Sequence, residues 1–317
     1  MPGKPKKAAP AAAPTRVLPG VGSLRDKLAK QYGTSLTRQD NTPTAYEVVS
    51  TGSLALDYAT VVGGWVKCRI HLLWGPEGCA TPTSAILSMA QAQRDEPNKA
   101  VGYIDMEQTF DFEWAQKHGL DTSEDRFIHV FPENSEDVAD LMKEMCRSGA
   151  VSMVVVDSVG GMVTKASTNN DAEKEEVGKN AKIITRMCQI TAVEARKSKT
   201  TVLIISQVRA IISATGGETF AAPKALRHAT TMVVKFRKSD KAITAQVDGE
   251  PIPVGQQFSA KVERSKVAAG GRTATITIMN LATKGRGPVG VAIVDEAWAV
   301  GPKPTVGASN TRGPWTA

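Results

Sequence analysis

The stretch IHLLWGPEGCATPTSAILSMAQAQR, residues 70–94, contains a strand, a loop and a helix in that order. The apolar run IHLLW is typical of a buried strand, and AILSMAQAQR has the composition of a helix. The loop between them, GPEGCATPTS, carries Pro82 near the expected first turn of the helix, where proline is tolerated. This stretch therefore predicts a strand–loop–helix unit, the start of an α/β fold.

The same alternation continues along the chain. The predicted strands are Arg69–Trp74, Ala100–Ile104, Phe127–Phe131, Met153–Val156 and Thr201–Ser206. Strands this apolar on both faces belong in a parallel sheet covered by helices. After Ala229 the segments TMVVKFRK, AITAQV, FSAKVER and ATITIM follow without long helices, which favours an antiparallel extension of the same sheet. We predict one core domain of this α/β class over residues 41–300.

The two ends of the chain differ from this core. Residues 1–22 combine Pro, Ala and Lys with few large apolar side chains, which predicts a disordered basic arm. Leu24, Leu28 and Tyr32 recur every four residues, so a short helix is expected within residues 23–40, where it can dock on a neighbouring subunit. Residues 301–317 are rich in Gly, Pro, Ser and Thr and predict a flexible tail.

The charge distribution favours an acidic partner. The chain has 39 Lys and Arg against 32 Asp and Glu, a net charge of +7, and ten of the basic residues lie between Arg196 and Lys241. A loop between such basic flanks can close on a polyanion, although a solvated surface is the alternative interpretation. No apolar run reaches the roughly 18 residues of a membrane-spanning helix, so we expect a cytoplasmic protein without a membrane partner.

Three polar residues close or follow apolar runs. Asp157 ends MVVVD, where an acid commonly holds a nucleotide-bound Mg²⁺ through water, although many strands end in Asp. Glu107 in YIDMEQTFD is placed either as a base that orients a water or as a loop-capping acid. Gln207 ends LIISQ, where its amide can contact a γ-phosphate or simply form a turn.

Four blocks of sequence carry a resemblance to a known family. STGSLALDYATVVGGWVKCRIHLLWGPEG, GYIDMEQTFD, SGAVSMVVVDSVGGMVTKA and LIISQVR resemble, in this order, the landmarks of the bacterial RecA recombinase family. The resemblance runs from about Arg25 to about Ala269 and looks closest to the shorter members found in phages. It implies a P-loop ATPase that uses ATP and Mg²⁺, polymerises as a homo-oligomeric filament on single-stranded DNA and pairs it with duplex DNA in recombination and repair.

The resemblance also implies roles for individual nucleotide-site residues. It makes Glu107 the catalytic glutamate, Gln207 the γ-phosphate sensor and Asp157 the Mg²⁺-associated acid. Without the family, Trp114 would be interpreted as a packing residue, and Arg264 and Lys266 as surface charges. The family pattern instead places Asp111 and Trp114 at adenine, Arg264 and Lys266 at the phosphates of an adjacent subunit, and Gly75, Pro76, Glu77, Gly78 and Thr83 in the phosphate loop.

Two further segments match the DNA-contacting loops of the family, about residues 167–182 and 209–227. Their basic residues are expected to neutralise DNA phosphates, and Phe220 is the one aromatic side chain there that can stack on a base. The predicted DNA-binding residues are Lys179, Lys182, Arg209, Lys224 and Arg227.

The phosphate loop departs from its pattern, G-x-x-x-x-G-K-[ST], at all three specific positions, which hold Ala80, Thr81 and Pro82. Losing two or three charge-assisted hydrogen bonds would weaken ATP binding by roughly 3–8 kcal/mol. Thr83 can offer a hydroxyl to Mg²⁺ after a one-residue shift, but nothing nearby replaces the lysine.

Three hypotheses follow. The first is a RecA-like filament on single-stranded DNA whose ATP binding and hydrolysis are weakened or lost. The second is an active DNA-dependent ATPase with a compensating geometry. The third is a non-catalytic scaffold or regulatory subunit of a homologous filament, which a flat salt dependence of DNA affinity would favour.

Overall fold

The computed structural model describes residues 21–32, 45–160, 173–210, 218–220, 224–247, 250–280 and 290–291. The chain divides into two units, residues 1–45 and 46–317. In the first unit a helix, α1 (Val21–Tyr32), exposes Leu24 and Leu28. Its role in assembly stays a prediction, and residues 33–40 of the predicted segment lie outside the described residues.

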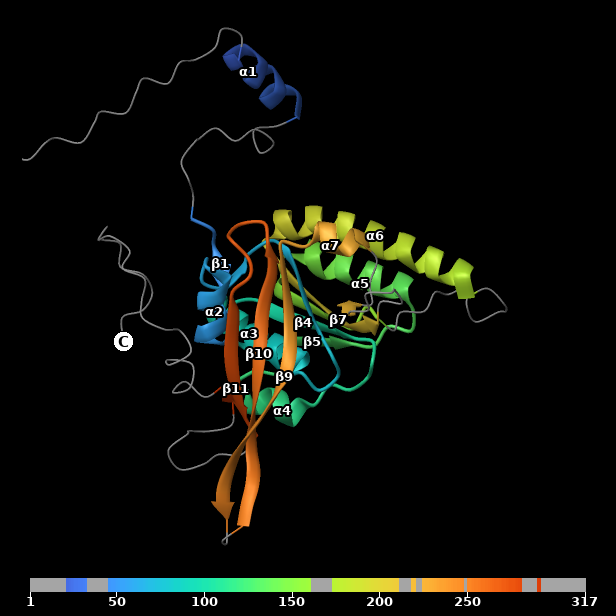
Figure 1. Cartoon of the computed structure of the whole chain (residues 1–317). Helices are drawn as coiled ribbons and strands as arrows, with labels where there is room; N and C mark the ends of the chain where they lie inside the picture. The colour runs from blue at the N-terminus through green and yellow to red at the C-terminus, as the bar shows by residue number, and fades with distance from the viewer. Residues whose placement is uncertain are drawn as a thin grey trace, which may run out of the picture. The chain divides into compact units, whose positions relative to one another are not determined.

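The second unit is built on a large mixed sheet with the strand order β12-β11-β10-β9-β3-β7-β6-β4-β5 (Figure 1). Its central strands run parallel to one another. They are β3 (Ile70–Gly75), β4 (Ala100–Asp105), β5 (Phe127–Val130), β6 (Val151–Asp157), β7 (Thr201–Ala210) and β9 (Met232–Val247). The strands β10 (Glu250–Ser265), β11 (Thr273–Met279) and β12 (Gly290–Val291) continue the sheet beyond β9, and each of them is antiparallel to the strand before it. The predicted α/β class with an antiparallel extension is confirmed.

Helices cover both faces of the sheet. The central strands alternate their side chains between the faces, so Leu73 joins one core and Leu72 the other. The helices are α2 (Leu54–Thr60), α3 (Thr81–Asp95), α4 (Phe112–Lys117), α5 (Ser135–Ser148), α6 (Glu173–Ser198) and α7 (Lys224–Ala229). Met89 of α3 packs in the first core, and Met142 of α5 and Met187 of α6 pack in the second. Among the described residues no helix is long and apolar enough to cross a membrane.

Two short strands stand apart from the large sheet. They are β1 (Val48–Val49) and β2 (Trp65–Val66), which pair antiparallel and flank α2. The indole of Trp65 is fully buried and donates a hydrogen bond of 2.9 Å to Ser88 in α3. This small sheet therefore fixes α3, the helix that follows the predicted phosphate loop.

One prediction about the strands is wrong. The segments TMVVKFRK and AITAQV are a single strand, β9, and not two strands. The register between β9 and β10 shifts between Gln256 and Phe258, which lie opposite Ala242 and Lys238. This irregularity accommodates the polar residues Ser239, Asp240 and Lys241, so the strand continues past them. As Figure 1 shows, the far ends of β9 and β10 project beyond the rest of the sheet as a two-stranded ribbon.

Candidate nucleotide and DNA site

The predicted phosphate loop connects β3 to α3 and makes a tight turn. Ala80 caps the N-terminus of α3 with φ 66° and ψ 24°, a left-handed conformation that favours glycine, and makes no side-chain capping bond. A Cβ atom on Gly75 would lie 2.5 Å from both the Sγ of Cys79 and the carbonyl oxygen of Phe236 in β9. The loop therefore keeps a sharp, closely packed turn, and Pro82 fits the first turn of α3.

Position 81, where the motif requires lysine, holds a buried hydroxyl. The Thr81 side chain is 7% exposed and the adjacent Cys79 is 1% exposed. The two lysines that are nearest in sequence, Lys67 and Lys99, both bind Glu96 at the opposite end of α3, with Nζ–carboxylate distances of 3.0 and 2.9 Å. Neither of these two lysines therefore supplies the charge that the lysine of the motif would bring to a phosphate.

The carboxylate of Asp157 accepts a hydrogen bond from a tyrosine. The hydroxyl of Tyr103 donates a hydrogen bond of 2.5 Å to Oδ2 of Asp157, which is 4% exposed. Burial raises the pKa of Asp157 to about 6, and the nearby carboxylates of Glu107 and Asp105 add to this increase. Among the described residues no cluster of three or more His, Cys, Asp or Glu side chains is arranged to hold a metal ion. The Tyr103 contact was not predicted, because it joins side chains of two neighbouring strands, β4 and β6.

The turn that carries Glu107 is organised by Asp105 at the end of β4. The buried carboxylate of Asp105 accepts the backbone N–H groups of Glu107, Gln108 and Phe110 at 3.2, 2.8 and 3.1 Å. His129 in β5 lies 3.3 Å from the same carboxylate. Asp105 thus fixes the direction in which Glu107 leaves the strand.

Glu107 and Gln207 lie together, as their predicted roles require. The amide of Gln207 donates a hydrogen bond of 2.8 Å to Oε1 of Glu107, and the hydroxyl of Ser158 donates one of 2.6 Å to the same oxygen. Ser158 was not predicted, although it directly follows Asp157 in the sequence. Gln207 was expected to end its strand, but it lies inside β7, which continues to Ala210. The turn after β4, the residue after β6 and Gln207 of β7 therefore converge on one carboxylate.

The predicted adenine residues lie at the start of α4. Asp111 caps this helix, because its carboxylate accepts the backbone N–H of Trp114 at 2.9 Å. The indole Nε1 of Trp114 donates a hydrogen bond of 3.1 Å to the hydroxyl of Thr83 in α3, and its ring lies 4.2 Å from that of His118. The oxygen of Thr83 proposed for Mg²⁺ therefore already accepts a hydrogen bond.

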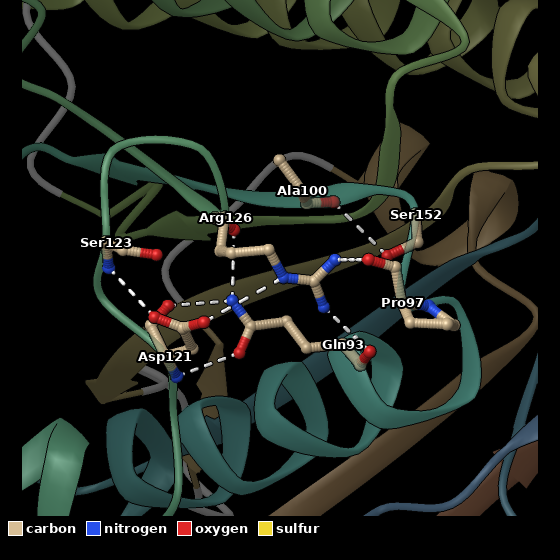
Figure 2. Close-up of polar contacts among 7 residues, drawn as sticks. All are labelled: Gln93, Pro97, Ala100, Asp121, Ser123, Arg126 and Ser152. Carbon is tan, nitrogen blue, oxygen red and sulfur yellow. Dashed lines mark hydrogen bonds and ion pairs between the residues drawn. The ribbon is translucent and has the colours of Figure 1, made fainter.

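A polar clamp holds the loop after α4 against α3 (Figure 2). The side-chain amide of Gln93 donates to the carbonyl groups of Asp121 and Arg126 at 2.8 and 3.0 Å. The guanidinium of Arg126 donates to the carbonyl oxygens of Gln93 and Pro97. Because this loop continues from α4, the clamp helps to position Trp114 beside α3.

Arg264 and Lys266 contact the end of α7 within the same chain. The guanidinium of Arg264 donates to the carbonyl of Arg227, and the ammonium of Lys266 donates to the carbonyl of His228. Burial lowers the pKa of Lys266, and the positive charges of Arg264 and Arg69 lower it further. These cations stabilise the C-terminal end of a helix, where the carbonyl groups lack helical partners.

The predicted DNA-binding residues lie on three elements. Lys179 and Lys182 are exposed on α6, and Arg227 is exposed on α7. Arg209 lies in β7 opposite Thr219, and Lys224 begins α7, but their side chains are outside the described part of the chain. Residues 161–172, 211–217 and 221–223, which include much of both predicted loops, also lie outside it.

The prediction for Phe220 is wrong. This residue lies in a short strand, β8 (Glu218–Phe220), and is only 6% exposed. Its ring centroid is 5.9 Å from that of Trp74 in β3, in an edge-to-face arrangement. Pairing of β8 with β7 directs the ring into the core, so Phe220 is not available for stacking on a base.

Comparison with known proteins gives one consistent result. The family model of the RecA N-terminal domain matches residues 23–285. Protein RecA of Chlorobaculum tepidum is 32% identical over 260 residues, which cover 80% of this chain and 72% of the relative. Protein RecA of Mesoplasma florum is 29% identical over 235 residues, covering 74% of this chain and 68% of the relative.

A solved structure shares the fold. The crystal structure of the RadB recombinase aligns with a TM-score of 0.54 and 22% sequence identity, and covers 74% of this chain and 97% of that one. At this identity the likeness concerns the arrangement of strands and helices alone.

Proposed function

This chain belongs to the RecA family of recombinases, and from that premise we propose that it acts in homologous recombination and DNA repair as a filament on single-stranded DNA, with ATP binding and hydrolysis weakened or lost. Its site of action is the cytoplasm, and its partners are single-stranded DNA, duplex DNA and further copies of the same chain.

The observation that supports weakened ATP use is the buried Thr81 side chain at the lysine position of the phosphate loop. Positioned positive charge is the main catalytic device of phosphoryl transfer, and bound ATP with its Mg²⁺ would meet no such charge from this loop. With the two nearest lysines in sequence bound to Glu96, the loss of roughly 3–8 kcal/mol in ATP affinity is not offset by them.

DNA binding is supported by the exposed basic residues Lys179, Lys182 and Arg227. Each phosphate neutralised by such a side chain releases counterions, so affinity for single-stranded DNA should fall steeply with salt. Burial of Phe220 removes the one aromatic residue expected to stack on a base. Contacts are therefore directed to the DNA backbone, which carries little sequence information.

A second candidate function is the active DNA-dependent ATPase. The convergence of Glu107, Gln207 and Ser158 favours it, because the groups that would orient water and sense a γ-phosphate are already in contact. The left-handed conformation of Ala80 also preserves the shape of the loop.

Binding of a fluorescent ATP analogue, with and without single-stranded DNA, separates these two functions. We compare the natural chain with the triple variant Ala80→Gly, Thr81→Lys, Pro82→Thr. The matched control is Ala80→Gly, Thr81→Gln, Pro82→Thr, which restores the loop backbone without the cation. Tight binding by the lysine variant alone supports the proposal.

Micromolar binding by the natural chain, with ATP hydrolysis stimulated by DNA, would establish the active ATPase instead. DNA affinity that does not change with salt would contradict the filament and favour a scaffold subunit.

A further inference from the structure

The short strand β8 ties the second predicted DNA-binding segment back to the sheet. It pairs antiparallel with the end of β7, with Val208 opposite Phe220, Arg209 opposite Thr219 and Ala210 opposite Glu218. These pairs begin immediately after Gln207. A pairing of three residues is marginal by itself, so it needs support from side chains.

Trp74 supplies that support. It precedes Gly75 at the end of β3, and its ring meets the ring of Phe220 at 5.9 Å with an interplanar angle of 69°. Edge-to-face pairs of this kind add stability beyond the buried area.

Trp74 is itself fixed from the neighbouring strands. Its indole N–H donates a hydrogen bond of 3.0 Å to Glu263 of β10. The ammonium of Lys235 in β9 lies 4.3 Å from the ring centroid, within cation–π range. Phe220 therefore rests on a side chain whose orientation is held by two other strands.

Arg227 lies over the same phenylalanine. Its guanidinium carbon is 6.0 Å from the centroid of Phe220, while the residue itself is exposed. The carbonyl groups of Arg227 and His228 are bound by Arg264 and Lys266, which hold the end of α7. One predicted DNA-binding residue is thus positioned by a ring that is anchored in the core.

We propose that Trp74 and Phe220 form a brace that positions Arg227 and the paired end of β7 for single-stranded DNA without a nucleotide. This inference rests on the proposed DNA-binding function. All the contacts of the brace come from side chains of the chain itself, so this part of the DNA site is ordered before DNA arrives. Preorganisation of this kind lowers the entropy cost of binding.

Loss of the brace and loss of a DNA contact should change different quantities in one titration, the affinity and its dependence on salt. We measure the anisotropy of a fluorescent oligo(dT) with the full-length chain, without nucleotide, at several salt concentrations. Phe220→Ala should weaken binding about tenfold at every salt concentration, because Arg227 and the paired end of β7 must then become ordered when DNA binds. Since the same phosphates are contacted in the end, the slope of log affinity against log salt should not change.

Two variants serve as matched controls. Trp74→Phe keeps an aromatic ring under Phe220 and should stay within about twofold to threefold of the natural affinity. Arg227→Gln removes a phosphate contact and should reduce the salt slope by about 0.7. Unchanged affinity for Phe220→Ala, or a change in its slope equal to that of Arg227→Gln, would overturn the brace.

Amide hydrogen exchange tests the brace independently of DNA. In the free chain, Phe220→Ala should raise the exchange rates of Val208, Ala210 and Phe220 at least tenfold and leave the β3 and β6 amides unchanged. If the natural chain binds no DNA but shows this local change, the proposed function fails and the brace stands. If exchange in β8 is the same in both proteins, the brace is wrong, whatever the DNA result.

Discussion

The side-chain amide of Gln207 is hydrogen-bonded to the carboxylate of Glu107 at 2.8 Å, although 100 positions separate the two residues in the sequence. The bond connects β7 to the turn after β4. In a nucleotide-free chain, Glu107 is therefore already held by the residue predicted to sense a phosphate.

We expect Gln207→Ala to lower the free energy of unfolding by about 0.5–1.5 kcal/mol, the usual contribution of one hydrogen bond. Gln207→Glu should lower it further at pH 7, because two carboxylates then face each other. Urea denaturation of both variants measures the difference. Equal stability of the natural chain and Gln207→Glu would show that the two side chains do not interact in solution.

Asp157 should make stability depend on pH. Its pKa is raised to about 6 by burial, so between about pH 4 and pH 6 the folded chain holds a proton that the unfolded chain releases. Stability from this group therefore falls as pH rises through that window. Asp157→Asn cannot ionise and should reduce the fall between pH 4 and pH 7 by roughly 2–3 kcal/mol.

Denaturation of the natural chain and of Asp157→Asn at pH 4 and at pH 7 measures this change in the free energy of unfolding. Asp57, whose pKa burial also raises to about 6, acts in the same window, so Asp57→Asn should produce a similar and separate reduction. If the free energy of unfolding falls more between pH 4 and pH 7 in Asp157→Asn than in the natural chain, the assignment of a raised pKa to Asp157 is wrong.

The contact between Thr83 and Trp114 should control the indole environment. Thr83→Val leaves the indole N–H without its acceptor and should cost about 1 kcal/mol, whereas Thr83→Ser keeps the hydroxyl and should be close to neutral. The Nε1–H signal of Trp114 in a ¹⁵N NMR spectrum reports the bond directly. An unchanged signal in Thr83→Val would mean that the indole donates elsewhere.

The Gln93–Arg126 clamp should contribute more than a surface pair. Arg126→Ala removes two donors to backbone carbonyl groups and should destabilise the chain by about 1–3 kcal/mol. Arg126→Lys keeps the charge but loses the planar fork, so it should recover only part of this stability. Thermal or urea unfolding of the two variants tests the order; a complete rescue by lysine would indicate a purely electrostatic role.

The sequence predicted the central strands because β3, β4 and β6 are apolar on both faces and end in characteristic loops. It failed within β9, where Ser239, Asp240 and Lys241 resemble a turn but are accommodated by an irregular register with β10. That irregularity depends on the partner strand β10. The sequence of β9 alone therefore does not predict that the strand continues through these three polar residues.

The candidate site could also be predicted only in part from the sequence. The resemblance gave Glu107 and Gln207 separate roles, and the hydrogen bond between them was not predicted. The contacts of Tyr103 with Asp157 and of Trp114 with Thr83 depend on side-chain conformations across neighbouring elements. The burial of Phe220 depends on the pairing of β8, whose three residues are too few to give a periodic signal.

The left-handed conformation of Ala80 separates two quantities that the phosphate loop controls. A glycine at this position would relieve roughly 1 kcal/mol of backbone strain, so Ala80→Gly is expected to favour folding. A lysine at position 81 would instead change the charge that meets a phosphate. The stability of the loop and its affinity for phosphate can therefore be altered one at a time.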